Sequence, residues 1–281
     1  MVGDNQTKEG GAVPAFLPLA PVHCIAYAGN GERKKNMRHA MSKQLNLPRI
    51  QTLRPATNEN LAIVAGGPSL NRTYKDISNF SDIMTCGSAH DHAVKLGIKP
   101  TYHVECDPDL RQIDCYNEVS DAFYLISSRC HKSMFKKLEG RKVYLWHMWE
   151  NELGKGPYKG EPAFICGATV VLSAVPIAMQ LGYKHLHFFG FDSSFPSFEE
   201  NHAYPMKEHS QQMTVKVGDP ISGKEFLSTA TWIGQAQQFQ DMRRNWPFRC
   251  TVYGDGMIAE MERTRMQTTL ADIKAETGAT L

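Results

Sequence analysis

An apolar run that ends in two glycines is the feature that most constrains the fold. Residues 61–65 read Leu-Ala-Ile-Val-Ala and are followed by Gly66, Gly67, Pro68, Ser69 and Leu70. A continuous apolar run of this length, bounded by glycine, is typical of a buried strand in a parallel sheet. Glycine allows a sharp turn and leaves room for a ligand, so N–H groups there can hold a phosphate. A tight strand-to-helix turn without a ligand leaves the same pattern, and both interpretations stay open.

Strands and helices alternate along the chain around this loop. Further strands are predicted at 82–86, 101–105, 122–126, 142–146, 185–189 and 250–253. Helices are predicted at 90–96, 131–138, 168–181 and 229–245. Such alternation predicts an α/β fold of the Rossmann-like class, a mostly parallel sheet with helices on both faces. The polar, glycine- and proline-punctuated stretch 193–224 is expected to be an irregular lid.

Three segments are expected from the composition along the chain. Residues 1–60 form an N-terminal arm with a candidate strand at 22–27 and a basic helix at 32–45. Residues 61–258 form the Rossmann-like domain, and 259–281 form a C-terminal helical tail. The stretch Met257–Thr277 is polar and predicted to be helical, so we expect it at the surface or in a homo-oligomer contact.

Composition and charge exclude several classes of protein. The 281 residues carry a net charge of only +2, so no strong field indicates nucleic acid or an anionic membrane. The seven cysteines form no C-x-x-C pair, which argues against a zinc ribbon or dithiol site and suits a reducing compartment. No run reaches the roughly 18 apolar residues of a membrane helix, and the N-terminus is a poor signal peptide. We therefore expect a cytoplasmic protein.

Polar residues follow the predicted strands where a ligand site is expected. Right-handed crossovers place the carboxyl ends of parallel strands along one edge of the sheet, where open α/β folds bind ligands. The residues at these ends are Gly66–Leu70, Gly87, Ser88, Asp107, Asp109, Ser127, Ser128 and Asp192. Because Pro68 has no N–H, the donors of the first loop would be Gly66, Gly67, Ser69 and Leu70. This convergence predicts a binding site.

Asp107 can bind a ribose hydroxyl, a divalent cation or an acceptor substrate. It could instead cap the next helix, although Asp109 fits that role better. Gly167, Ala168 and Thr169 precede the helix at 168–181, whose first amides could hold a second anion. Close packing of that helix on the sheet would equally require Gly167, and we keep both alternatives.

His202, in the predicted lid, is the candidate general acid or base. Most loop histidines have no such role, and His209 is a weaker candidate. The pairs His90/His92 and His185/His187 have no third ligand beside them, so no metal site is predicted.

Several of these motifs, in this order, resemble the MptE-like family. That family includes archaeal 6-hydroxymethylpterin diphosphokinases and the central domain of Maf flagellin glycosyltransferases, and it is similar to family 42 sialyltransferases. Val64–Leu70 resembles their "GxGPSL" loop, and 167–192 resembles a later signature that ends in Gly190-Phe191-Asp192. Asn201-His202-Ala203 resembles a "SHA" element, and Tyr253-Gly254-Asp255-Gly256 resembles an "HGDG" near the end of the domain.

The resemblance implies a nucleotide-dependent transferase with a Rossmann-like core. In the sialyltransferase-like branch the donor is a CMP-linked nonulosonic acid, no metal is strictly needed, and His202 matches the catalytic histidine. In the pterin branch the enzyme transfers pyrophosphate from Mg-ATP, so Mg²⁺ would bind at Asp107 and Asp192. Gly66 and Gly87 stand where the sialyltransferases often carry Asn. A binding or assembly protein that has lost the chemistry is the third alternative, and the acceptor is not identified.

Overall fold

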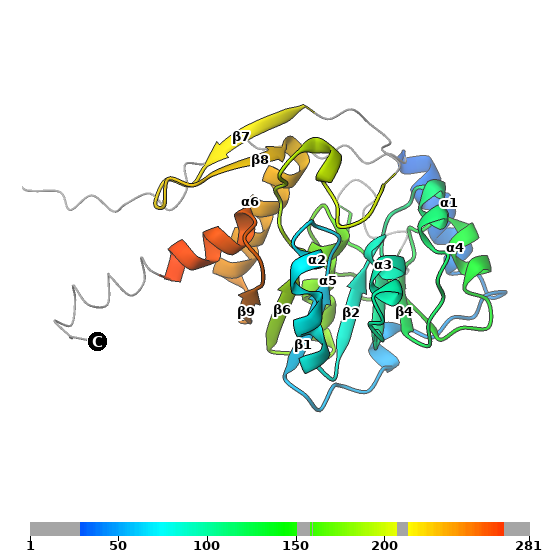
Figure 1. The fold of residues 1–281 in the computed structure, drawn as a ribbon. Coiled ribbons are helices and arrows are strands. Elements are labelled where there is room, and N and C mark those ends of the chain that lie inside the picture. The colour runs from blue at the N-terminus through cyan, green and yellow to red at the C-terminus, as the bar shows by residue number, and fades with distance from the viewer. Residues whose placement is uncertain (1–28, 151–157, 159, 207–212, 267–281) are drawn as a thin grey trace, which may run out of the picture.

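A parallel sheet of seven strands organises the molecule (Figure 1). The computed structural model describes residues 29–150, 158, 160–206 and 213–266, so the candidate strand at 22–27 lies outside the described residues. The strands of the sheet are β1 (Asn60–Val64), β2 (Ile83–Cys86), β3 (Tyr102–Glu105), β4 (Phe123–Ser127), β5 (Val143–Trp146), β6 (His185–Phe189) and β9 (Arg249–Val252). Each lies within two residues of a strand predicted from the sequence.

The order of the strands creates a crevice between β1 and β6. The order is β5-β4-β3-β2-β1-β6-β9, and every neighbouring pair is parallel. The chain runs outward from β1 to β5 and then returns to the other side of β1, where Val64 pairs with Thr85 of β2 and Phe189 of β6. At such a reversal the two loops leave in opposite directions, and a ligand can bind between them.

Helices cover both faces of the sheet, which confirms the predicted fold class (Figure 1). They are α1 (Asn30–Ala40), α2 (Leu70–Thr73), α3 (Ala89–Lys95), α4 (Lys132–Lys137), α5 (Val170–Gln180) and α6 (Ala230–Asn245). Short 3-10 helices are η1 (Ile50–Thr52), η2 (Tyr74–Asn79), η3 (Leu110–Cys115) and η6 (Phe198–Glu200). Within the described part of the chain, no helix is both long and apolar enough to cross a membrane.

The two faces of β1 belong to separate hydrophobic cores. Leu61 and Ile63 lie in the main core with the apolar face of α5, whereas Ala62 and Val64 pack with Leu70 of α2. Successive strand residues point to opposite faces, so a strand covered on both sides must be apolar throughout. This explains the uninterrupted apolar run that precedes the glycines.

The predicted lid is more ordered than the sequence indicates. Strand β7 (Thr214–Gly218) lies within the 193–224 stretch and pairs with β8 (Glu225–Thr229) as an antiparallel hairpin, yellow in Figure 1. The prediction of an irregular segment is therefore wrong at 214–218. Its Thr-Val-Lys-Val-Gly sequence alternates between exposed and half-buried positions, which is the pattern of a strand with one covered face.

The helix at 257–266 is part of the core rather than a surface helix. Met257, Ile258 and Met261 are at most 5% exposed and belong to the main core. The expectation of a surface or oligomer helix is wrong for these residues, because their apolar side chains cover the sheet beside β6 and β9. Residues 267–281 lie outside the described residues.

Candidate functional site

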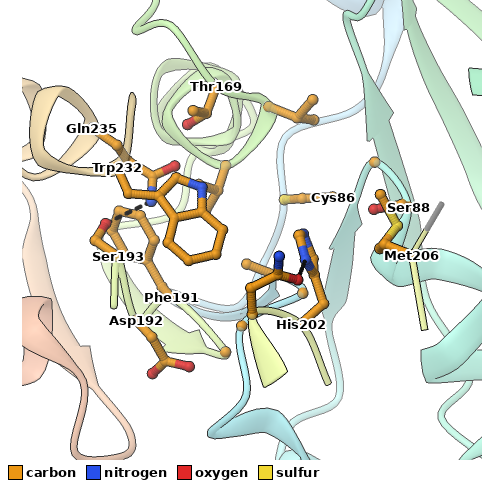
Figure 2. Close-up of a pocket in the computed structure, with 18 of the residues that line it drawn as sticks. Cys86, Ser88, Thr169, Phe191, Asp192, Ser193, His202, Met206, Trp232 and Gln235 are labelled. Atoms are coloured by element: carbon orange, nitrogen blue, oxygen red, sulfur yellow. Dashed lines mark hydrogen bonds between the residues drawn. The ribbon is translucent and has the colours of Figure 1, made fainter. Parts of the chain in front are cut away.

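A cavity of about 340 Å³ opens at the crevice between β1 and β6. Figure 2 shows Thr169, Asp192, His202 and Ser88 around it, with Trp232 between them. Of the residues predicted from the sequence, the cavity is lined by Gly66, Gly67, Gly87, Ser88, Asp107, Thr169, Asp192 and His202. Segments that are far apart in the sequence therefore meet at one site, as the strand-end argument predicts.

Eight predicted residues do not line this cavity, and three of them are the strand-end residues Asp109, Ser127 and Ser128. Leu70 is fully buried in the core, and Pro68 and Ser69 line a neighbouring cavity instead. Gly167 and Ala168 precede α5 and are also absent from the wall. Fewer residues therefore line the site than the sequence motifs suggest.

Most N–H groups of the first glycine loop are already bonded inside the protein. Gly67 N–H donates to the carbonyl oxygen of Gly190 at 2.7 Å, and Ser69 N–H donates to Asp192 Oδ2 at 2.8 Å. Leu70 N–H donates to the carbonyl oxygen of Gly67 at 3.1 Å. The prediction that these three amides hold a phosphate is therefore wrong in this structure, because β6 and its loop satisfy the first two and the turn itself satisfies the third. Gly66 is the remaining candidate donor.

Close packing explains Gly167, but the crowding residues are Leu172 of α5 itself and Gln238 of α6 and not the sheet, as the alternative had expected. A Cβ at this position would lie 2.3 Å from Leu172 Cδ1, which leaves no space for a side chain. The N–H of Ala168 donates to Gln238 Oε1 of α6 at 2.7 Å. Ala168 is thus joined to α6, and its N–H is not free for an anion.

The N-terminus of α5 is a candidate anion site in the wall. Thr169 precedes the helix without a side-chain capping bond, and its Oγ1 has no partner among the described residues. Val170 and Val171, in the first turn, line the cavity. First-turn N–H groups have no partner within a helix, and the helix dipole adds about half a positive charge there. An anion is stabilised at such an end.

Asp192 fastens the glycine loop and borders the cavity at the same time. Burial raises the pKa of its carboxyl group, while hydrogen bonding from Ser69 acts in the opposite direction. A Cβ on Gly67 would lie 2.5 Å from Asp192 Oδ2, and a Cβ on Gly256 would lie 2.6 Å from the Cβ of Asp192. Glycine at both positions is what allows this carboxylate to sit under the loop.

Asp107 is held by its own loop at the end of β3. Its Oδ1 accepts the N–H of Asp109 at 2.9 Å, and its Oδ2 accepts Nε2 of Gln112 at 2.9 Å. Asp109 caps η3 by accepting the N–H of Arg111, which confirms the capping role expected for it. Asp107 itself is half-buried and lines the cavity with Gln112.

The described residues that line the cavity include carboxylates but no lysine or arginine. Asp107 and Asp192 are its acidic side chains. No group of three or more His, Cys, Asp or Glu side chains in the described ranges is arranged to hold a metal ion. Positive potential in this part of the site therefore comes from backbone amides at the start of α5.

His202 is neutral and presents one ring nitrogen as a proton acceptor. Burial lowers its pKa to about 4. Its Nδ1 lies 2.7 Å from Asn201 Oδ1, and an amide oxygen can only accept, so Nδ1 carries the proton. Nε2 is then the free acceptor. The ring lies edge-on to Trp232 with centroids 5.7 Å apart (Figure 2).

Residues 201–204 are fastened onto the first glycine loop. Ala203 N–H donates to the carbonyl oxygen of Gly66 at 2.9 Å, and Tyr204 Oη lies 2.7 Å from Ser88 Oγ. A Cβ on Gly66 would lie 2.4 Å from Tyr204 Oη. Gly66 therefore makes room for Tyr204, which brings His202 to the site.

Sequence reasoning missed the helix α6 side of the site. Trp232 and Gln235 line the cavity, and Gln235 Nε2 donates to Ser193 Oγ at 2.7 Å (Figure 2). Ser193 has a φ of +52°, an uncommon backbone conformation for a residue other than glycine. Periodicity shows that α6 is a helix, and a tryptophan among glutamines was its only local signal. Its orientation toward the cavity depends on tertiary packing.

A second cavity of about 320 Å³ adjoins the first. The two share Asp192 and Ser194 in their walls. The second is otherwise lined by Pro68, Ser69, Arg72, Phe195, Pro196, Lys224, Glu225, Phe226, Leu227, Asp255 and Gly256. It lies between the glycine loop and the start of β8, so the site has two compartments.

Comparisons with known proteins place this geometry in context. The family model described as "6-hydroxymethylpterin diphosphokinase MptE-like" matches residues 35–198. Among solved structures, the Maf glycosyltransferase from Magnetospirillum magneticum AMB-1 is similar, with a TM-score of 0.58 and 15% identity. The alignment covers 85% of this chain and only 42% of that protein. The comparison with curated proteins gives no match.

Proposed function

Because the chain belongs to the MptE-like family, we propose that it is a cytoplasmic nucleotide-dependent transferase, most simply a glycosyltransferase with a CMP-linked sugar donor. The observation that carries the choice of donor is the charge of the cavity wall. An amide-lined helix N-terminus faces the cavity, and no lysine or arginine is among the described residues that line it.

The charge of the donor phosphate fits this wall. A CMP-linked sugar has one phosphodiester with a single negative charge, which a helix N-terminus can stabilise. The triphosphate of ATP carries several negative charges, and enzymes that bind it use lysine and Mg²⁺ to neutralise them. We therefore place the donor phosphate at the start of α5, beside Thr169 and the N–H of Gly66.

The two adjoining cavities support a transferase rather than a binding protein. A transferase must hold a donor and an acceptor beside each other, and the compartments meet at Asp192 and Ser194. In this proposal Trp232 contacts the donor, and the acceptor approaches from the compartment beside β8.

His202 would act as the general base. Its Nε2 takes the proton of the acceptor hydroxyl, and the acceptor oxygen forms a bond to the anomeric carbon. The bond from that carbon to the phosphate oxygen breaks, and CMP leaves with the electron pair. The amides at the start of α5 stabilise the negative charge that develops on the phosphate.

The test is the hydrolysis of a CMP-linked sialic acid, with water as the acceptor, by the wild type and by His202→Ala. We expect a loss of about 10²- to 10⁴-fold in rate, the usual contribution of a general base. His39→Ala on helix α1 is the matched control and should hydrolyse the donor at the wild-type rate. Equal rates for the wild type and His202→Ala would remove His202 from the mechanism.

A pyrophosphokinase that uses Mg-ATP is the second candidate, favoured by the description of the family model and by Asp107 and Asp192 in the wall. Each carboxylate already accepts an N–H bond but retains further lone pairs, so either could hold a Mg²⁺ that the phosphates bring with them. Transfer of pyrophosphate from ATP to a pterin alcohol that EDTA abolishes would support this candidate. Activity unaffected by EDTA would exclude it.

A non-catalytic binding or assembly protein is the third candidate, and a thermal-shift screen separates it from the others. A ligand at 100 times its dissociation constant adds roughly 2.7 kcal/mol to the free energy of unfolding. We expect a shift with CMP, which has a single phosphate, and not with ATP or GTP. No shift with any nucleotide would favour this third candidate.

A further inference from the structure

Helices α1 and α4 form one continuous surface, although they are far apart in the sequence (Figure 1). Ala40 of α1 lies in one hydrophobic cluster with Met134 and Phe135 of α4. Asn36 Nδ2 of α1 donates to the carbonyl oxygen of Arg129, three residues before α4, at 3.0 Å. The exposed faces of the two helices are therefore held next to each other.

The buried face of α1 carries a cation that is neutralised inside the protein. Arg33 Nη1 lies 2.8 Å from Glu150 Oε2, and the two side chains are only 9% and 7% exposed. A buried charge is costly unless it is paired, so this ion pair fixes which side of α1 faces the core. The other cations of α1 then face solvent.

The outer faces of the two helices gather positive charge. Six exposed cations have no carboxylate within ion-pair distance among the described residues, and we call them the basic face: Lys34, Lys35, Arg38, Lys132, Lys136 and Lys137. Glu32 is the acidic side chain of α1, and α4 has none. The whole chain has a net charge of only +2, so folding concentrates charge that the composition averages out.

The cations of both helices act on one side chain between them. Burial lowers the pKa of His131, which precedes α4, while the charge of Glu32 acts in the opposite direction. The charges of Lys132 on α4 and Lys35 on α1 lower this pKa as well. One ring is thus within reach of cations from both helices, so the basic face has a single field.

The basic face offers charge but no apolar anchor. Phe135 is the only Phe, Tyr or Trp of the two helices, and it is buried in the core. The large apolar side chains that are exposed in the described part of the chain lie elsewhere, at Leu110, Ile165, Met213, Ile221 and Met266. Protein partners are bound mainly through aromatic and apolar anchors, and single-stranded nucleic acid through stacking on aromatic rings. Neither kind of partner fits this face.

We propose that the basic face docks on the surface of an anionic lipid bilayer. A cluster of four to eight lysines or arginines on a helix surface is attracted to anionic headgroups, at about fivefold in affinity per cation. Five of the six cations are lysines, whose compact charges need no fixed geometry, whereas arginine is the better residue for clamping nucleic acid phosphates. This contact holds the protein on the membrane surface and requires no spanning helix.

The test is co-sedimentation of the protein with vesicles of phosphatidylcholine alone and of an equal mixture of phosphatidylcholine and phosphatidylglycerol. We expect binding to the mixed vesicles at low salt and none to phosphatidylcholine alone. Because no apolar side chain of the basic face inserts, binding should disappear at about 1 M salt, where charges are screened within about 3 Å. Binding that survives this salt, or no binding to the mixed vesicles at low salt, would overturn the proposal.

Two charge-reversal variants locate the contact. Lys35→Glu combined with Lys136→Glu should weaken binding to the mixed vesicles at least about 30-fold, because two cations are lost. Lys75→Glu combined with Lys95→Glu changes exposed lysines of η2 and α3 and alters the net charge equally, so it is the matched control and should bind like the wild type. Equal losses in both variants would overturn the proposal, since only net charge would then matter.

An RNA oligonucleotide separates the remaining alternative. Tighter binding to the RNA than to the mixed vesicles, lost in the Lys35 and Lys136 variant, would assign the basic face to nucleic acid and overturn the proposal. No sugar donor is used, so these outcomes are independent of the proposed transferase activity.

Discussion

At the scale of single residues, glycines decide which other side chains reach the site. Gly66 is the clearest case, because Tyr204 occupies the space that a side chain there would need. The space beside its Cα holds Tyr204 Oη, and Tyr204 carries the segment that contains His202. A glycine in the first loop thus makes room for a side chain 138 positions later in the sequence.

Gly66→Ala tests this account. The added methyl group would lie 2.4 Å from Tyr204 Oη, so Tyr204 must leave Ser88 and the 201–204 segment must move. We expect a loss of about 1–3 kcal/mol in the free energy of unfolding, measured by urea denaturation, the usual cost of overpacking. Gly31→Ala in α1, where the methyl group meets nothing within 4 Å, is the control. Equal stability of both variants would contradict the packing of Tyr204 against Gly66.

Residue-scale reasoning from sequence placed several side chains at the cavity but not the amides. Asp107 and Asp192 were predicted because strand ends converge on one edge, Thr169 because it precedes a helix, and His202 because it lies in the predicted lid. The amides of Gly67 and Ser69 were expected to be free, but their acceptors come from the loop after β6, more than 120 residues later. No local pattern contains such a pairing.

At the scale of elements, the β5 edge of the sheet is held by contacts outside the ladder. Arg49 forms an isolated parallel β-bridge with Leu145 of β5. The Glu161 carboxylate binds the Arg49 guanidinium and also lies 3.0 Å from His147 Nε2. The hydrogen bond from Arg49 is the main reason that the pKa of Glu161 is lowered to about 2. The ordinary value is 4.5, so this carboxylate favours the folded state when it is ionised.

Glu161→Gln should therefore change stability in a pH-dependent way. Because the pKa of Glu161 is lowered in the folded state, its ionised carboxylate adds fully to the free energy of unfolding above about pH 5. This contribution disappears as the pH falls from 4.5 toward 2. We expect the variant to lose about 1–3 kcal/mol of unfolding free energy at pH 7, a range that allows for partial solvent screening. Near pH 2 its unfolding free energy should equal that of the wild type. Urea unfolding at both pH values measures this. A deficit that is the same at pH 7 and pH 2 would contradict the ion-pair explanation.

The helix at 257–266 gives a second prediction at this scale. Ile258 is fully buried in the main core, so Ile258→Ala should cost about 2–5 kcal/mol of unfolding free energy. Met266→Ala, at a side chain 58% exposed, should change it by less than about 0.5 kcal/mol. Similar effects of the two substitutions would mean that this helix does not belong to the core.

The elements that the sequence predicted well are those whose pattern is local. Each strand of the parallel sheet is a short apolar run between turn residues, and each was predicted within two residues. Strand β7 was missed because its five residues lie in a stretch rich in glycine, proline and charge. The helix at 257–266 was placed at the surface because its charged residues conceal an apolar face.

At the scale of the whole molecule, the reversal of strand order at β1 produces the site. It opens the crevice in which the loops after β1, β2, β3 and β6 meet the start of α5, and α6 closes it with Trp232. Right-handed crossovers predict that the strand ends share one edge, whereas the strand order and the contribution of α6 required the packed structure. The account rests on a nucleotide binding in this crevice.

A crystal structure with CMP tests that claim most directly. The account predicts density for the nucleotide in the cavity between β1 and β6, with the phosphate within hydrogen-bonding distance of the first amides of α5 and Trp232 in contact with the ligand. An empty cavity at saturating CMP, or CMP bound elsewhere on the molecule, would contradict it.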